Sequence, residues 1–206
     1  VVDTLINDLE FTTAIAKYRY SRCHALFPSI VRKLVKRYLA KEMANIQTVD
    51  DVQAIIGKYL DNLIGKTTTS LTHDGLQYLD SSTPYLFISN HRDIAMDPAL
   101  VNYILYQKSF KTFQIAIGDN LLKRPFLSNL MRLNKSFIVK RGISGREKLK
   151  ESKRLSAYIH YSLEEGENVW LAQREGRSKN GLDRTESAII KMLHLVKRDK
   201  SDKMGL

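Results

Sequence analysis

The sequence predicts an α/β fold, in which a mixed central sheet is covered by helices and preceded by a helical N-terminal extension. From about residue 71, short apolar runs alternate with helical periods, which is typical of strands linked by helices. Before residue 71, apolar residues recur at helical spacing. The 206 residues, 43% of them hydrophobic, suffice for one such domain. We therefore expect a helical region over 1–70 and an α/β domain over 71–206 that is incomplete at its C-terminal end.

The N-terminal region contains an amphipathic helix over residues 27–41, followed by a second helix over 49–64 and a connector over 66–70. The apolar residues of the first helix share one face and cations cover the rest. The apolar residues are Phe27, Ile30, Val31, Leu34, Val35, Tyr38 and Leu39, and the cations are Arg32, Lys33, Lys36, Arg37 and Lys41. Such a helix either packs on its own domain or lies on an anionic bilayer.

Four strands and four helices alternate in the second part of the chain. The predicted strands are 85–89, 113–117, 136–139 and 169–172, and the predicted helices are 98–108, 121–132, 145–165 and 184–197. The first of these helices is expected to begin at Asp97-Pro98, because Asp is favoured at the N-cap and Pro at the first helical position. Polar residues follow three of the strands, and ligands of open α/β sheets bind beyond strand ends.

The net charge of +11, from 33 Lys and Arg against 22 Asp and Glu, predicts anionic partners. Nucleic acid, phosphorylated metabolites and an acidic membrane surface all qualify. Nucleic acid is disfavoured, because the cations lie next to glycine-rich turns without interleaved aromatic residues. The single cysteine, Cys23, excludes a disulfide framework within one chain and indicates a reducing compartment. No apolar run approaches the ~18 residues of a membrane span.

His91 comes directly beyond the predicted strand over 85–89, and two carboxylates, Asp93 and Asp97, follow within six residues. A histidine whose ring is held by a carboxylate is a general-base arrangement. A histidine near an aspartate is, however, most often structural, and the helix cap alone explains Asp97.

Cations follow two further predicted strands. The strand over 136–139 ends at Lys140 and Arg141, which suit a phosphate or carboxylate ligand, although exposed cations are also the norm on protein surfaces. The strand over 169–172 leads into a loop that contains Glu175, Gly176, Arg177 and Ser178. Glycine lets a ligand approach the backbone, and Arg and Ser can bind phosphate oxygens.

In order and spacing, these three blocks resemble the glycerolipid acyltransferases, which include lysophosphatidic acid and glycerol-3-phosphate acyltransferases. The blocks are Asn90-His91-Arg92 through Asp97, Phe137-Ile138-Val139-Lys140-Arg141 and Glu175-Gly176-Arg177-Ser178. The resemblance covers roughly residues 71–197. More narrowly, the sequences of residues 90–94, 118–122 and 172–177 resemble those of a bacterial branch of the family that is common in Bacteroidetes.

The resemblance implies transfer of a fatty acyl group from an acyl thioester, acyl-CoA or acyl carrier protein, to a hydroxyl of a glycerol-phosphate-type or lysophospholipid acceptor. It implies no metal and no cofactor. His91 would act as general base with Asp97. The residues implied in substrate binding are Arg92, Lys140, Arg141, Glu175, Gly176, Arg177 and Ser178. We expect a bacterial enzyme of phospholipid biosynthesis, cytoplasmic and peripheral on the inner membrane, whose partners are the donor, an anionic lipid acceptor and the membrane surface.

Two departures from the family pattern leave choices open. Five residues separate His91 from Asp97, where the family usually has four, so Asp93 is an alternative partner of the imidazole; we favour Asp97. Gly176 and Arg177 are adjacent, where the family usually has one residue between them. Two other functions also remain open. One is acylation of an amino-acid-linked lysolipid with a carboxylate head, and the other is a non-catalytic basic domain that binds membrane or nucleic acid, which would not need His91.

Overall fold

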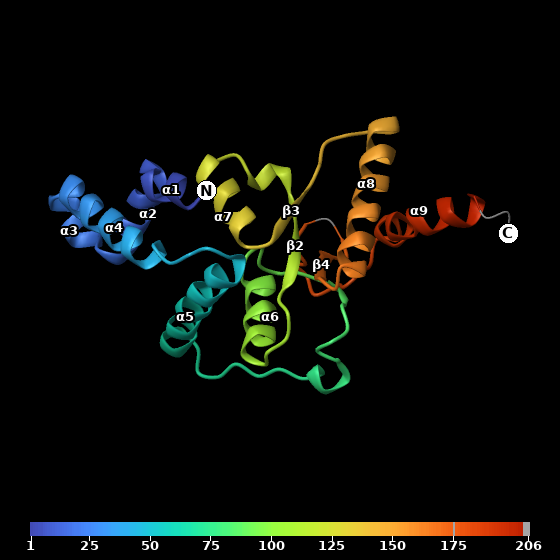
Figure 1. The fold of residues 1–206 in the computed structure, drawn as a ribbon, viewed down its shortest axis with the longest axis horizontal. Helices are drawn as coiled ribbons and strands as arrows, with labels where there is room; N and C mark the ends of the chain where they lie inside the picture. Colours follow the sequence, from blue (N-terminus) through green and yellow to red (C-terminus); the bar gives the residue numbers. More distant parts are fainter. Residues whose placement is uncertain (175, 204–206) are drawn as a thin grey trace. The chain divides into compact units, whose positions relative to one another are not determined.

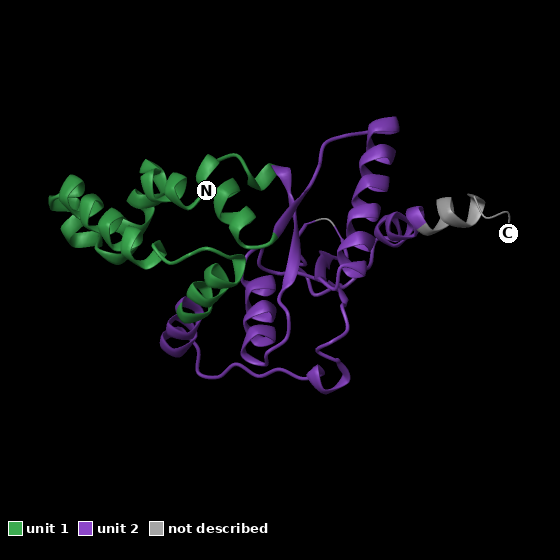
Figure 2. Ribbon diagram, in the orientation of Figure 1, with its two compact units in different colours: residues 1–58, 120–135 green, residues 59–119, 136–206 purple. Residues whose placement is uncertain are grey.

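The computed structural model describes residues 1–174 and 176–203, with side chains up to residue 196. The chain forms two compact units, one of residues 1–58 and 120–135 and the other of residues 59–119 and 136–206 (Figure 2). This division differs from the boundary expected at residue 70. Residues 120–135 belong with the N-terminal helices because Phe126 packs its ring 5.9 Å from Phe11, and Arg124 forms a 2.7 Å ion pair with Glu10.

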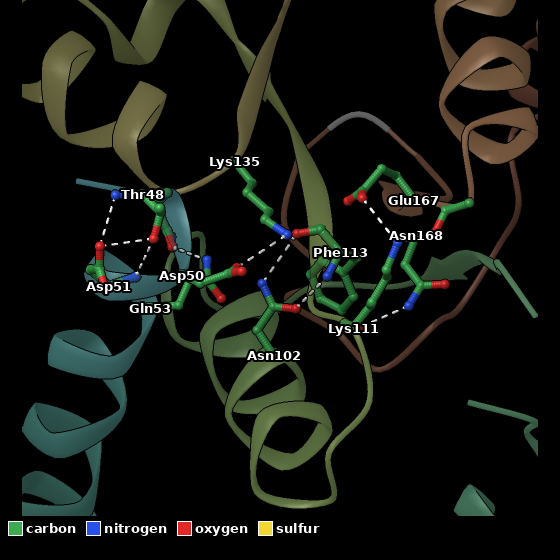
Figure 3. A network of polar contacts seen from close by, with 12 residues as sticks. Thr48, Asp50, Asp51, Gln53, Asn102, Lys111, Phe113, Lys135, Glu167 and Asn168 are labelled. Atoms are coloured by element: carbon green, nitrogen blue, oxygen red, sulfur yellow. Dashed lines mark hydrogen bonds and ion pairs between the residues drawn. The ribbon is translucent and has the colours of Figure 1, made fainter. Parts of the chain in front are cut away.

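The first unit is helical, as predicted. Its helices are α1 (Val2–Asn7), α2 (Leu9–Arg19), α3 (Ser21–Leu26), α4 (Pro28–Met43), the first half of α5 (Val49–Thr67) and α7 (Pro125–Leu133) (Figure 1). Ala16, Val31 and Val35 form a core between α2 and α4. Thr48 and Asp51 form a capping box at the start of α5: the Asp51 carboxylate accepts the Thr48 N–H at 2.8 Å, and the Thr48 hydroxyl oxygen accepts the Asp51 N–H at 3.2 Å (Figure 3).

The second unit is built on a sheet of four strands in the order β1-β4-β2-β3. The strands are β1 (Leu86–Ser89), β2 (Phe113–Gly118), β3 (Ser136–Val139) and β4 (Asn168–Ala172). The α/β class is confirmed. All three pairings between these strands are parallel, which corrects the expectation of a mixed sheet. The physical reason is that a helix separates each strand from the next along the chain, and such crossovers join parallel strands.

Helices α8 (Gly145–Glu164) and α9 (Ser187–Lys203) pack on each other and cover one face of the sheet (Figure 1). The core on this face consists of Ile159 from α8 with Val169 and Leu171 from β4. Alternate residues of β2 point the other way, and Phe113, Ile115 and Ile117 are buried there. No helix in the described ranges combines the length and the apolar composition needed to cross a bilayer.

Two buried asparagines hold the beginnings of the strands. Asn102 of α6 (Met96–Gln107) accepts the Phe113 N–H at 2.8 Å and donates to the Phe113 carbonyl at 3.3 Å (Figure 3). Asn168 accepts the Tyr85 N–H at 2.7 Å and donates to the Lys111 carbonyl at 2.7 Å. These contacts satisfy main-chain groups where the ladder of the sheet begins. They also fix the register that brings the other ends of the strands to one edge.

Candidate active site

The parallel sheet brings the predicted site residues to a single edge. His91 follows β1, Arg174 follows β4, Asp119 follows β2 and Arg141 follows β3. The Arg141 N–H donates to the Asp119 carboxylate at 3.2 Å, which joins two of these strand ends directly. The carboxyl edge of a parallel sheet is where α/β proteins bind ligands, so the three sequence blocks meet at the expected place.

The His91 ring is half-buried against Trp170. The two rings meet edge to face, with centroids 6.2 Å apart and planes at 84°. Trp170 is itself fixed, because its indole N–H donates to the Ser89 hydroxyl at 2.9 Å and its ring stacks on Phe113. The Nδ1 atom of His91 is buried and has no hydrogen-bond partner among the described residues. Buried polar atoms without a partner are rare, and a catalytic role is one of the explanations for them.

The two aspartates after His91 have different contacts. The Asp97 carboxylate accepts the N–H of Arg92 at 2.6 Å and the N–H of Asp93 at 3.2 Å. The Asp93 carboxylate accepts the N–H of Ala95 at 2.9 Å and of Met96 at 2.7 Å. The helix therefore begins at Met96 rather than at Pro98. Its N-cap residue is Ala95, the Asp93 carboxylate accepts the N–H groups of Ala95 and Met96 from outside the helix, and Asp97 lies in the first turn, which corrects the predicted cap.

Asp97 acts on His91 through its charge and through the loop. It raises the pKa of the imidazole, and its carboxylate holds the main chain directly after His91. We expected the Asp97 carboxylate to hold the His91 ring by a hydrogen bond. Asp97 makes no such bond with Nδ1, which has no partner in the described part of the chain. Asp93, the alternative, is occupied by the N–H groups of Ala95 and Met96.

The pKa of His91 lies below its ordinary value. Burial of the ring is the main cause, and the positive charges of Arg141, Arg177 and Arg174 add to it, whereas Asp97 opposes it. Three guanidinium groups are thus close enough to repel a proton on the imidazole. This favours the neutral ring, which is the form that can accept a proton.

Arg174 is the member of this cluster that the sequence analysis did not single out. Its Nη2 donates to the Arg177 carbonyl at 3.0 Å, and its Nε is buried without a partner among the described residues. The one sequence signal that could have identified Arg174 is its position just after a predicted strand. Arg174 comes directly after the strand that pairs with β1, so its place beside His91 depends on a strand order that the sequence does not reveal.

Lys140 and Arg92 contribute differently from Arg141. The Lys140 ammonium pairs with Glu151 of α8 at 3.2 Å, so the structure does not bring it together with the three guanidiniums. Arg92 is exposed like Arg141, but it is not among the arginines whose charge lowers the pKa of His91. Its main-chain N–H is bonded to Asp97.

The loop after β4 is held by Ser178. Its N–H donates to the His91 carbonyl at 2.8 Å, and its buried hydroxyl donates to Asp183 at 2.9 Å, so this serine positions the loop against His91. Gly176 has a φ of +78°, a left-handed conformation that favours glycine, and the space around it is open. The left-handed conformation explains a glycine at this turn, and its predicted part in substrate binding stays a prediction. Glu175 lies outside the described residues.

Gln173 is a second residue that the sequence analysis did not identify. Its side-chain amide donates to Asn90 and accepts from the Thr185 hydroxyl at 3.0 Å. Its main-chain N–H donates to the Ser89 carbonyl at 2.9 Å. Gln173 therefore ties the residue before His91 to the end of β4.

The model of the acyltransferase family matches residues 70–193, which is more than half of the chain and includes all three blocks. The chain belongs to the acyltransferase family. The resemblance seen in the sequence is therefore confirmed at the level of the family, while the bacterial branch stays a prediction. No curated protein matches the chain. As an acyltransferase, the protein is an enzyme that transfers acyl groups, and its α/β architecture is consistent with that family.

Proposed function

We propose that this acyltransferase moves a fatty acyl group from an acyl thioester to the hydroxyl of an acceptor with an anionic head, of the glycerol-phosphate or lysophospholipid type. The donor is acyl-CoA or acyl carrier protein. One observation carries the proposal: a histidine with an unpartnered ring nitrogen lies within the electrostatic reach of three guanidinium groups at the sheet edge. A base next to an anion site suits a reaction in which the acceptor carries both a hydroxyl and a negative charge.

The steps follow from these groups. The acceptor hydroxyl gives its proton to the imidazole of His91 as its oxygen attacks the thioester carbonyl carbon. The tetrahedral intermediate collapses and breaks the C–S bond. The departing sulfur takes the proton back from the imidazolium, so the products are an ester and a free thiol. Asp97 stabilises the imidazolium by its charge, as the carboxylate of a serine-protease triad does.

The guanidinium cluster supplies the acceptor's anion site. Arg141 and Arg177 lie in the loops that follow two different strands, β3 and β4, and Arg174 adds a third charge. Guanidinium groups bind phosphate through charge-assisted bidentate hydrogen bonds, and several together suit a dianionic head. Because a fatty acyl ester of such an acceptor is a lipid and the chain is strongly basic, we place the enzyme peripherally on the bacterial inner membrane.

The direct test is an acyl-transfer assay with purified protein, long-chain acyl-CoA or acyl carrier protein, and a panel of acceptors. The panel contains glycerol 3-phosphate, lysophosphatidic acid, lysophosphatidylcholine and an amino-acid-linked lysolipid. We expect ester formation with a phosphate-headed acceptor. Turnover of the amino-acid-linked lysolipid alone would instead support the carboxylate-headed alternative. No turnover with any pair would contradict acyl transfer to lipids.

Arg141→Ala and Arg177→Ala should each raise the KM for the acceptor by roughly ten- to a hundredfold, because each removes a charge-assisted contact to the head. The KM for the thioester donor should change far less. Steady-state kinetics with each substrate varied in turn check this. Arg92 offers a matched control, because it is not among the arginines whose charge acts on His91, and Arg92→Ala should have the smaller effect. Equal changes in both KM values would place the anion site elsewhere.

The pH profile should report the charges around His91. Activity requires the neutral ring, so it is lost as pH falls through the lowered pKa of His91. Arg141→Gln removes one repelling charge, raises that pKa and should move the acid limb of kcat/KM to higher pH. A bound anionic acceptor offsets the same charges, so the acid limb of kcat should lie at higher pH than that of kcat/KM in the wild-type enzyme. Coincident limbs, unmoved by Arg141→Gln, would show that the guanidiniums do not act on the base.

A further inference from the structure

Helix α4 carries two parallel rows of apolar side chains, and only one of them is buried. Val31 and Val35 pack against Ala16 of α2. Phe27, which precedes the helix, Ile30, Leu34 and Tyr38 form the other row. Their exposed fractions are 58%, 58%, 61% and 41%. The sequence analysis left open whether this helix packs on its own unit or meets a bilayer. The row of Val31 and Val35 packs on the helix's own unit. The other row stays exposed and could contact a bilayer.

The exposed row, Phe27, Ile30, Leu34 and Tyr38, is called the α4 face below. Its spacing of three and four residues makes it a continuous stripe on one side of the helix. Lys33, Arg37 and Lys41 follow one another at four-residue intervals, so they form a second line along the edge of this stripe, and all three are exposed. The α4 face is therefore an apolar stripe bordered by a line of positive charge.

Amphipathic side chains lie where the α4 face ends. The Arg19 guanidinium is 4.7 Å from the ring centroid of Tyr38 and 5.9 Å from that of Tyr20. Tyrosine and arginine of this kind combine an apolar body with a polar tip, which suits the boundary between acyl chains and headgroups. Beyond the other end of α4, Leu26 is 74% exposed and extends the apolar surface.

We propose that the α4 face docks the protein onto an anionic lipid surface, with Ile30 and Leu34 among the acyl chains and Lys33, Arg37 and Lys41 at the headgroup phosphates. Charge complementarity selects this occupant. Helix α4 contains five cations and a single carboxylate, Glu42. A second copy of the chain, packed through the same face, would bring these cations near each other. The proposed function explains why the enzyme would approach a lipid surface, and the inference rests on it for that reason alone. The docking surface itself is inferred from the side chains of α4.

The test measures binding of the full chain to vesicles, without turnover. One set of vesicles is phosphatidylcholine alone, and the other contains equal parts of phosphatidylcholine and phosphatidylglycerol. We expect binding to the anionic set, weakening as salt is added. Leu34→Glu should weaken that binding by about tenfold or more, because a charge replaces a side chain that would be buried in the bilayer. Leu149→Glu, at an exposed leucine of α8, is the matched control and should bind like wild type.

A triple variant, Lys33→Gln with Arg37→Gln and Lys41→Gln, tests the charged line. It should lose the preference for anionic over neutral vesicles. All variants should keep the wild-type thermal unfolding midpoint, because none of the substituted residues is buried. Binding of Leu34→Glu at wild-type affinity would overturn the proposal. So would sedimentation showing a wild-type dimer that Leu34→Glu dissociates, since a second copy would then cover the face.

Turnover of the water-soluble acceptor glycerol 3-phosphate keeps the two proposals separate. A Leu34→Glu protein that loses vesicle binding and retains this turnover supports docking through α4. Vesicle binding by a wild-type protein that turns over no acceptor also supports docking, and contradicts the proposed acyl transfer alone.

Discussion

His91→Ala should reduce acyl transfer by about 10²–10⁴-fold while the fold survives, because the reaction loses its general base. The ring lies just beyond the C-terminal end of β1, half-buried against Trp170. Its Nδ1 makes no hydrogen bond with the described residues. Its removal therefore breaks no network that holds the sheet together. Turnover of the purified variant, measured together with its thermal unfolding midpoint, checks both parts of the expectation.

Two further variants sharpen this result. His91→Gln keeps a polar side chain of similar size but has no group that can accept the proton, so it should be as inactive as His91→Ala. His73→Ala replaces an exposed histidine in the segment before β1 and should leave turnover unchanged. Wild-type turnover in either His91 variant would remove the base from the mechanism, and a loss in His73→Ala would point to a general effect of losing imidazole.

Hydrophobic periodicity was enough to place the strands. The predicted strand over 136–139 coincides with β3, and the other three differ from the observed strands by one residue at one end. The central strands β2 and β4 are mostly buried, and a strand covered on both faces has a continuous apolar sequence. The start of α6 was less predictable, because two aspartates four residues apart can each cap a helix. The main-chain N–H groups of Ala95 and Met96 bond to Asp93, and this moves the start two residues earlier.

The composition of the site was harder to predict than its place. The roles of Gln173 and Arg174 depend on the pairing of β1 with β4, two strands about eighty residues apart whose adjacency no local pattern reveals. The separation of Lys140 from Arg141 likewise depends on Glu151, which a different element supplies. Sequence reasoning identified the residue types at the strand ends. The partners that fix each side chain come from tertiary contacts.

Asp97→Asn should lower turnover by about 10²–10⁴-fold while the loop after His91 keeps its conformation. The asparagine retains a carbonyl oxygen that can accept the Arg92 and Asp93 N–H groups, which the carboxylate accepts at 2.6 and 3.2 Å. It lacks the negative charge that raises the pKa of His91. The imidazolium formed during the reaction then faces the arginine charges without compensation. Turnover and the pH dependence of kcat/KM check this expectation. The acid limb of kcat/KM should move to lower pH.

Asp97→Ala and Asp93→Asn separate charge from loop geometry in this expectation. Asp97→Ala removes the main-chain acceptor as well as the charge, so it should be at least as slow as Asp97→Asn and also less stable to heat. Asp93→Asn keeps a side-chain oxygen that can accept the N–H groups of Ala95 and Met96, and should retain most of the turnover. If Asp93→Asn were the slow variant and Asp97→Asn the active one, Asp93 would be the carboxylate that supports the base, and the role of His91 would stand. Full activity of both Asp97→Asn and Asp97→Ala would contradict the expectation, because the charge of Asp97 would then not be needed to stabilise the His91 imidazolium.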